Sequence, residues 1–197
     1  MLRILCVLVS LSLGTQAYGE GSGYSNSASG KLSNGLTNKV TRTLTRGVQN
    51  CLRLEKVYRY DCYRSVYGLA AQQLSSNAAY DEARKVLSDV EAALANTIQR
   101  NLDPSAPRKR RGVQQFNAIK ESALPRAKRD FLRSLDQAET RLLRSSSNDN
   151  VHFVKIASAI NSNKVLLRSA LLMLPIAPVI AAPLFIPTYL RDVRAVS

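Results

Sequence analysis

The chain lacks most of the residues on which metal and redox sites depend. Tryptophan is absent from its 197 residues, histidine occurs once and cysteine three times. One histidine and three cysteines are too few for an ordinary all-protein zinc site, and the cysteines are too sparse for a disulfide-rich scaffold. A hydrophobic content of 45% excludes a wholly disordered chain. The sequence therefore predicts one folded domain of ordinary size.

Acidic residues are also scarce, since 14 Asp and Glu stand against 28 Lys and Arg and leave a net charge of +14. The surplus is uneven: residues 31–64 carry +6 and residues 108–144 carry +7, whereas residues 77–103 carry −2. A positive surface attracts polyanions and anionic lipid head groups, and the attraction weakens as salt rises. We expect the acidic segment to lie beside the basic ones.

Catalytic motifs are missing. The sequence contains no C-x-x-C, H-E-x-x-H, P-loop or G-x-S-x-G pattern. The single histidine, His152, follows a polar segment and is predicted to start a helix. We therefore predict no catalytic, cofactor-binding or metal-ligating residue and a protein that is not an enzyme. A hydrolase without a recognisable motif is kept as an alternative.

The N-terminus has the pattern of a secretory signal. Residues 1–19 contain Arg3, an apolar run of ten residues from Ile4 to Leu13, and small residues after it. A membrane span needs about 20 apolar residues, so an N-terminal anchor is less favoured. Residues 20–35, rich in Gly, Ser and Asn, are expected to be a flexible leader. The chain is thus predicted to be exported, to the periplasm of a bacterium or to the extracellular space.

The middle of the chain, residues 36–168, has helical periodicity throughout. Apolar residues recur every three or four positions, which is typical of amphipathic helices that pack on one another. The four clearest stripes are Leu36, Val40, Leu44 and Val48; Tyr60, Tyr63, Tyr67, Ala70 and Leu74; Tyr80, Ala83, Leu87, Val90, Leu94 and Ile98; and Phe116, Ile119, Ala123, Ala127, Phe131, Leu135, Ala138 and Leu142. We predict an all-α bundle of four to five helices. Residues 75–77 offer helix caps, and Pro125 predicts a kink or a new start near Leu124.

A last stripe of Val154, Ala157, Asn161 and Val165 predicts the final helix. Asn161 falls among apolar residues, and Asn163 and Lys164 follow it. This placement indicates a buried polar contact that fixes the register of the helix.

Cys51 and Cys62 are the two cysteines left after removal of the signal. On one continuous helix they would lie about 16 Å apart, whereas a disulfide needs Cα atoms roughly 4.4–6.8 Å apart. A disulfide within the chain therefore requires the helix to break between Leu52 and Asp61. Export favours this pairing, and free thiols or a bridge between two chains are the alternatives.

Four tyrosines, Tyr58, Tyr60, Tyr63 and Tyr67, alternate with Arg59 and Arg64. The spacing is typical of core residues whose hydroxyls lie at the rim. The same pattern could also hold a planar or anionic ligand by stacking and guanidinium contacts.

The densest basic run is Arg108-Lys109-Arg110-Arg111. A solvated loop without a dedicated ligand is the simplest interpretation, and contact with an anionic surface is the functional one. Nuclear import conflicts with the secretory signal, and cleavage by a convertase would need a eukaryotic export route. Aromatic residues do not alternate with the run, so nucleic acid is not expected as a partner.

The segment 169–190 has no formal charge and is as long as a bilayer span, with a short basic C-terminus at 191–197. It contains four prolines, Pro175, Pro178, Pro183 and Pro187, each of which costs about 3 kcal/mol inside a helix. An extended strap in a hydrophobic groove, of the chain itself or of a protein partner, is therefore preferred to a transmembrane anchor.

Together these features predict an exported, non-enzymatic helical protein, without a cofactor, at an anionic surface of the cell envelope. Its expected partners are anionic lipid or an envelope polymer. The main alternative is a membrane protein anchored by residues 169–190 with its helical domain outside the cytoplasm.

Overall fold

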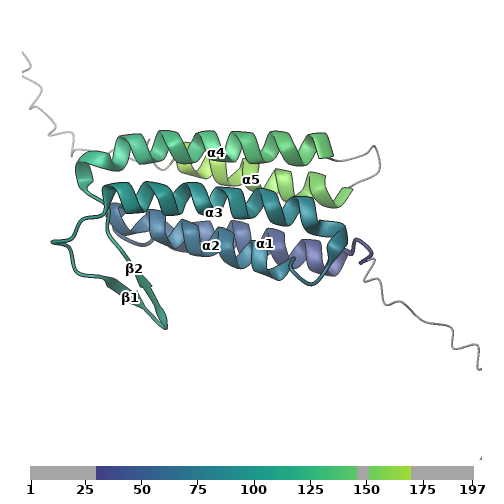
Figure 1. The fold of residues 1–197 in the computed structure, drawn as a ribbon, viewed down its shortest axis with the longest axis horizontal. Helices are drawn as coiled ribbons and strands as arrows, with labels where there is room; N and C mark the ends of the chain where they lie inside the picture. Colours follow the sequence, from purple (N-terminus) through teal and green to yellow (C-terminus); the bar gives the residue numbers. More distant parts are fainter. Residues whose placement is uncertain (1–29, 146–150, 170–197) are drawn as a thin grey trace, which may run out of the picture.

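The fold is seen in a computed structural model that describes residues 30–145 and 151–169 (Figure 1). The predicted signal at 1–19, most of the predicted leader, the segment 170–190 and the C-terminus at 191–197 lie outside the described residues. Within the described ranges, no helix combines the length and the apolar character that crossing a membrane requires.

The described residues form five α-helices and one short β-hairpin. The helices are α1 (Asn34–Cys51), α2 (Arg59–Gln73), α3 (Asp81–Asn101), α4 (Leu124–Ser145) and α5 (Val151–Ser169). Short 3₁₀ turns, η1 (Lys56–Tyr58), η2 (Ala78–Tyr80) and η3 (Glu121–Ala123), lead directly into α2, α3 and α4. The strands β1 (Lys109–Arg111) and β2 (Gln114–Phe116) lie between α3 and α4. The predicted all-α bundle is confirmed, and the hairpin is an addition that the periodicity did not indicate.

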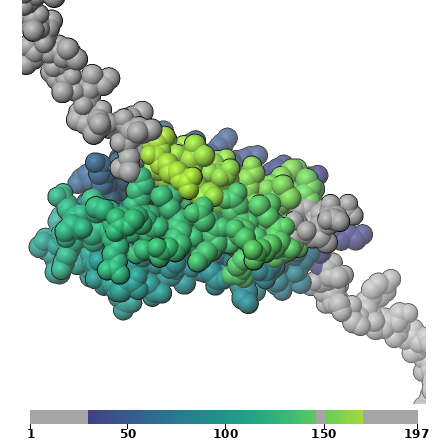
Figure 2. Space-filling model, turned by 90° about the horizontal axis from the view of Figure 1, so that it is seen from above, coloured from purple at the N-terminus to yellow at the C-terminus, as the bar shows by residue number. Residues whose placement is uncertain are grey.

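The helices close into an elongated ring (Figure 1). Each packs against the next along the chain, and α5 packs against α1. Successive helices run antiparallel, including α3 and α4, which are joined by the longer segment that contains the hairpin, so α1 and α5 run in the same direction. On the face seen in Figure 2, α4 and α5 lie side by side. Every helix therefore buries a stripe between two neighbours.

The predicted stripes of α2, α3 and α4 are the buried faces of those helices. Phe131 of α4 stacks on Tyr63 with 5.2 Å between ring centroids and meets Tyr67 edge to face at 5.9 Å. These contacts join α2 to α4 across the centre of the ring. The tyrosine cluster thus belongs to the core, and Tyr67 is completely buried.

The start of the fourth stripe has a different explanation. Phe116 and Ile119 are buried as expected, but they lie in the hairpin and the segment after it. Pro125 marks a new start, because α4 begins at Leu124 and the missing N–H of proline is tolerated in the first turn of a helix. The expected cap before α3 is also present, since the side chain of Asn77 accepts a hydrogen bond from the backbone N–H of Ala79.

The stripe predicted for α5 is right at Ala157, which is buried, and wrong at its other three positions. Val154 and Val165 are about half exposed, at 45% and 58%, and Asn161 is exposed. The buried face instead includes Asn163, whose side-chain amide donates to the hydroxyl of Tyr67 (3.2 Å) and to the carbonyl of Leu44 (3.4 Å). The expected polar contact in the core exists, but Asn163 makes it rather than Asn161.

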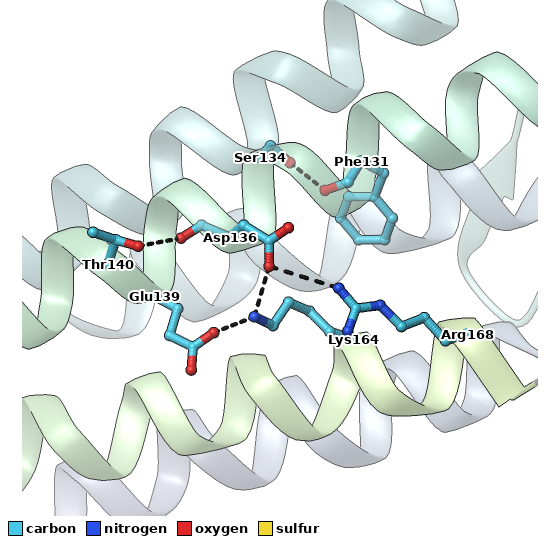
Figure 3. A network of polar contacts seen from close by, with 7 residues as sticks. All are labelled: Phe131, Ser134, Asp136, Glu139, Thr140, Lys164 and Arg168. Carbon is cyan, nitrogen blue, oxygen red and sulfur yellow. Dashed lines mark hydrogen bonds and ion pairs between the residues drawn. The ribbon is translucent and has the colours of Figure 1, made fainter.

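Lys164 forms a second polar contact between α4 and α5 (Figure 3). Only 9% of its side chain is exposed, and its ammonium group binds both Asp136, at 2.7 Å, and Glu139. Arg168 lies 3.9 Å from the same carboxylate of Asp136. Burial lowers the pKa of Lys164, but the two carboxylates outweigh this effect and hold the pKa above its usual value. A lysine can therefore occupy the buried face of α5 as a cation.

Cys51 and Cys62 form the predicted disulfide within the chain. α1 ends at Cys51, the chain turns through η1, and the two Cα atoms lie 5.7 Å apart. The helix breaks between Leu52 and Asp61, as the pairing requires.

We predict that the bundle loses stability in alkali through its buried tyrosines. Burial raises the pKa of Tyr60 to about 12, although the charge of Arg59 opposes the shift, and burial likewise raises the pKa of Tyr63 and Tyr67. The folded chain keeps these protons where an unfolded tyrosine, with a pKa of about 10, releases them. The free energy of unfolding should therefore fall as the pH rises through 10 towards about 12.

Urea unfolding measured at a series of pH values tests this, with Tyr60→Phe expected to weaken the pH dependence. If Tyr60, Tyr63 and Tyr67 ionised near pH 10 in the folded chain, seen in the near-ultraviolet absorbance of tyrosinate, the prediction would be wrong.

Candidate anionic-surface interface

The basic run lies on the β-hairpin. β1 and β2 pair antiparallel, with Lys109 opposite Phe116 and Arg111 opposite Gln114. The two-residue turn between them is Gly112-Val113, and Gly112 has φ +60°, a conformation that glycine adopts without strain. The hairpin projects from the bundle at the end where α1 and α3 terminate (Figure 1).

A buried carboxylate fixes the base of this hairpin. Asp61 in the first turn of α2 is 1% exposed. One of its oxygens accepts a hydrogen bond from Arg64 at 2.7 Å, and the other accepts both the backbone and the side-chain N–H of Asn117, at 2.8 and 2.9 Å. Phe116 inserts into the core, and the hydroxyl of Tyr58 donates to the carbonyl of Pro107 at 2.8 Å. The basic run is thus held on a rigid support.

The four basic residues have different surroundings. All are exposed, but Lys109 pairs with Glu55 at 2.9 Å, and Arg111 donates to the carbonyl of Asn50, the penultimate residue of α1, also at 2.9 Å. Arg110 donates to the carbonyl of Gly112 in the turn, and Arg108 borders a hollow beside Asp61 and Arg64. The alternation of a strand explains why Lys109 and Arg111 both reach the bundle.

The tip of the hairpin is apolar. Val113 is 97% exposed, the highest exposure of any large hydrophobic residue that the structure describes. An apolar side chain next to arginines suits the boundary between lipid head groups and acyl chains, where both kinds of residue are favoured.

α1 carries a second basic feature that lines up with the hairpin. The helix contains no acidic residue, and its cations Lys39, Arg42 and Arg46 lie on one face because they are spaced by three and four residues. We call these three residues the basic strip. All are exposed, and within the described residues none forms an ion pair with an acid.

The basic strip continues into the hairpin. Asn50 follows Arg46 by four residues, so its carbonyl group, which binds Arg111, lies at the end of the same face. From Lys39 to Asn50 this face of α1 covers about 16 Å of helix. Beside it, between α1 and α2, is a shallow groove of about 440 Å³. The helices approach closely there, because a Cβ added at Gly47 would lie 2.7 Å from the side chain of Val66.

The run at 108–111 was predicted as a contact for an anionic surface, whereas the basic strip was not predicted. The signal for it is present, since residues 31–50 contain four basic residues and no acid. Isolated cations at helical spacing resemble any solvated helix face, and the strip is recognisable only once the hairpin is seen to end against Asn50.

His152 belongs to a hydrogen-bond network that connects the starts of several helices. It is the second residue of α5, as predicted, and its Nδ1 lies 2.8 Å from the hydroxyl of Thr37. That hydroxyl lies 2.7 Å from the hydroxyl of Tyr80, which donates to the carbonyl of Ser33 at 2.9 Å. Thr37 and Tyr80 are completely buried, so the network joins the starts of α1, α3 and α5. Among the described residues there is also no group of three or more His, Cys, Asp or Glu that could hold a metal ion.

We predict that Asp61→Asn loosens the hairpin and destabilises the bundle. The substitution leaves Arg64 without its buried counter-charge and places an amide group against donors. The free energy of unfolding should fall by about 2 kcal/mol, and amide hydrogen exchange should rise in residues 109–117. Asp130→Asn is the control, because its ion pairs with Arg126 and Arg133 are long and at the surface, at 3.8 and 3.9 Å. Equal denaturation midpoints for the two variants would contradict the assignment.

Comparisons with protein-family models, with curated proteins and with solved structures find no match for this chain. No residue role is therefore carried over from a relative.

Proposed function

We propose that this chain is an exported, non-enzymatic helical protein that binds an anionic surface of the cell envelope, lipid or polymer. The contact is made by the basic strip on α1 together with the hairpin. The observation that carries the proposal is an acid-free helix whose three unpaired cations continue into a rigid basic hairpin.

The use of acids elsewhere in the bundle supports this assignment. Arg141 of α4 binds both Glu82 and Asp89 of α3, and Lys164 of α5 binds Asp136 and Glu139 of α4. Arg64 of α2 also lies 3.7 Å from Glu91 of α3, so ion pairs between helices neutralise cations on α2, α4 and α5. α1 is held by neutral contacts instead, for example between Thr43 and Gln73 of α2 at 3.0 Å. Its cations consequently remain available to an external anion.

The hairpin adds an apolar component to this contact. Val113 at the tip would enter the region below the head groups while Arg110 stays at their level. The proposal of export draws support from the Cys51–Cys62 disulfide, since such bonds persist in oxidising compartments.

Vesicle sedimentation tests the proposed contact. The chain should bind vesicles that contain anionic lipid at low salt and detach as the salt concentration rises. It should not bind neutral vesicles. A basic residue near an anionic membrane contributes about 1 kcal/mol. The triple variant Lys39→Gln, Arg42→Gln, Arg46→Gln should therefore bind about 100-fold more weakly.

The matched control removes one exposed lysine and two exposed arginines elsewhere, by Lys85→Gln, Arg100→Gln and Arg144→Gln. Both triple variants have the same net charge, so a location-specific contact predicts that the control keeps most of its binding. Equal losses in the two variants would show that only net charge matters, and equal binding to neutral vesicles would reject the electrostatic contact.

A further inference from the structure

A separate hollow lies at the disulfide end of the bundle. It is bordered by the starts of α2 and α4 and by the last turns of α5, and its volume is about 330 Å³. This volume falls at the small end of the range for ligand sites, which is about 300–1,000 Å³. The walls are mainly apolar, formed by Tyr60, Tyr63, Leu124, Phe131 and Leu167.

The aromatic walls are fixed by their own contacts. Tyr60 and Tyr63 meet edge to face at 5.9 Å, and Tyr63 stacks on Phe131. The hydroxyl of Tyr60 donates to the carbonyl of Leu124 at 3.3 Å, which ties α2 to the start of α4. The polar end of Tyr60 is thus engaged within the protein, and its ring is left as an apolar wall.

Three cations surround this apolar space. Lys56 comes from η1, Arg59 from α2 and Lys128 from α4, and none of the described residues that line the hollow is acidic. Within the described residues none of the three forms an ion pair with an acid. Arg59 uses its Nε to bind the carbonyl of Leu54 at 2.8 Å, which orients the guanidinium group.

Lys128 shows most clearly that a counter-charge is lacking. It is only partly exposed, and both its burial and the nearby charge of Arg168 lower its pKa. Lys164, one helix away, is also buried but lies between two carboxylates that raise its pKa. The same type of residue is thus paired within the protein at one position and unpaired beside an apolar hollow at the other.

We propose that this hollow binds a single-chain amphiphile with a carboxylate head, that is, a fatty acid. The acyl chain lies among Tyr60, Tyr63 and Phe131, and the carboxylate binds Lys128 and Arg59. Charge complementarity selects this occupant. The uncharged segment 170–190 of the same chain could fill the apolar space but would leave the three cations without an anion. The site is independent of the basic strip and does not rest on the proposed surface contact.

Calorimetric titration of the full chain with dodecanoate, kept below its micelle concentration, tests the proposal. We expect saturable binding at one site. Dodecanol, which has the chain without the charge, and acetate, which has the charge without the chain, should each bind at least about tenfold more weakly. Hydrogen exchange should show that dodecanoate protects amides at the starts of α2 and α4.

Lys128→Gln should weaken dodecanoate binding about tenfold, because it removes one charge-assisted hydrogen bond. Lys85→Gln removes the same charge from an exposed position on α3 and should bind as the original chain does. The triple variant of the basic strip should also keep its dodecanoate affinity, so failure of one proposal leaves the other standing.

Three results would overturn the assignment. Dodecanol could bind as tightly as dodecanoate, or Lys128→Gln could leave the affinity unchanged while circular dichroism shows an intact fold. The full chain could also fail to bind dodecanoate at all, as it would if residues 170–190 filled the hollow.

Discussion

The covalent link between Cys51 and Cys62 is the constraint on which the rest of the structure depends. It places the end of α1 against the first turn of α2. The neighbours of Cys62 in that turn connect the link to other parts of the molecule: Asp61 holds the hairpin, and Tyr60 and Tyr63 wall the hollow. A disulfide that closes so short a loop acts mainly by restricting the unfolded chain, by about 3 kcal/mol. Here it also fixes the turn from which both proposed binding features are built.

Some charged side chains of this molecule form ion pairs within the protein, and others have no acidic partner among the described residues. Nearly every acid that the structure describes forms an ion pair, Asp103 and Glu121 being the exceptions. Exposed pairs of this kind contribute little stability one by one. Their distribution nevertheless matters, because they connect α2 to α3, α3 to α4 and α4 to α5, and leave α1 out. Among the described residues, the three cations of α1 and the three around the hollow are therefore left without an acid, although single cations elsewhere also lack one.

Much of the fold could be predicted because its helices are amphipathic with little ambiguity. Leu87, Leu94 and Leu135, for example, lie on the apolar face of their helices, and their spacing alone predicts that they are buried. α5 failed because its buried face carries Asn163 and Lys164 while Val154 and Val165 face solvent. The buried face also carries Phe153, Ile156, Ile160 and Leu167, so apolar residues occur on both faces of α5 and their spacing alone does not identify the one that packs.

The hairpin could not be found from local sequence, since its strands have three residues each and consist mostly of charged and polar side chains. Its stability comes from distant contacts, such as those of Asp61 with Asn117 and of Tyr58 with Pro107. The candidate binding surfaces likewise depend on how the helices are arranged in space. The run at 108–111 is visible in the sequence, whereas the basic strip and the hollow depend on residues brought together from separate helices.

The number of antiparallel helices that the structure describes is odd, and this determines where the two ends of the bundle's chain lie. α1 starts at one end of the bundle and α5 finishes at the other (Figure 1). The described chain thus enters and leaves at opposite poles, separated by about the 28 Å length of a 19-residue helix. A bundle with an even number of helices would return the chain to the pole from which it started. In this one, Asn34 and Ser169 are held at opposite ends of the bundle by the packing of the helices between them.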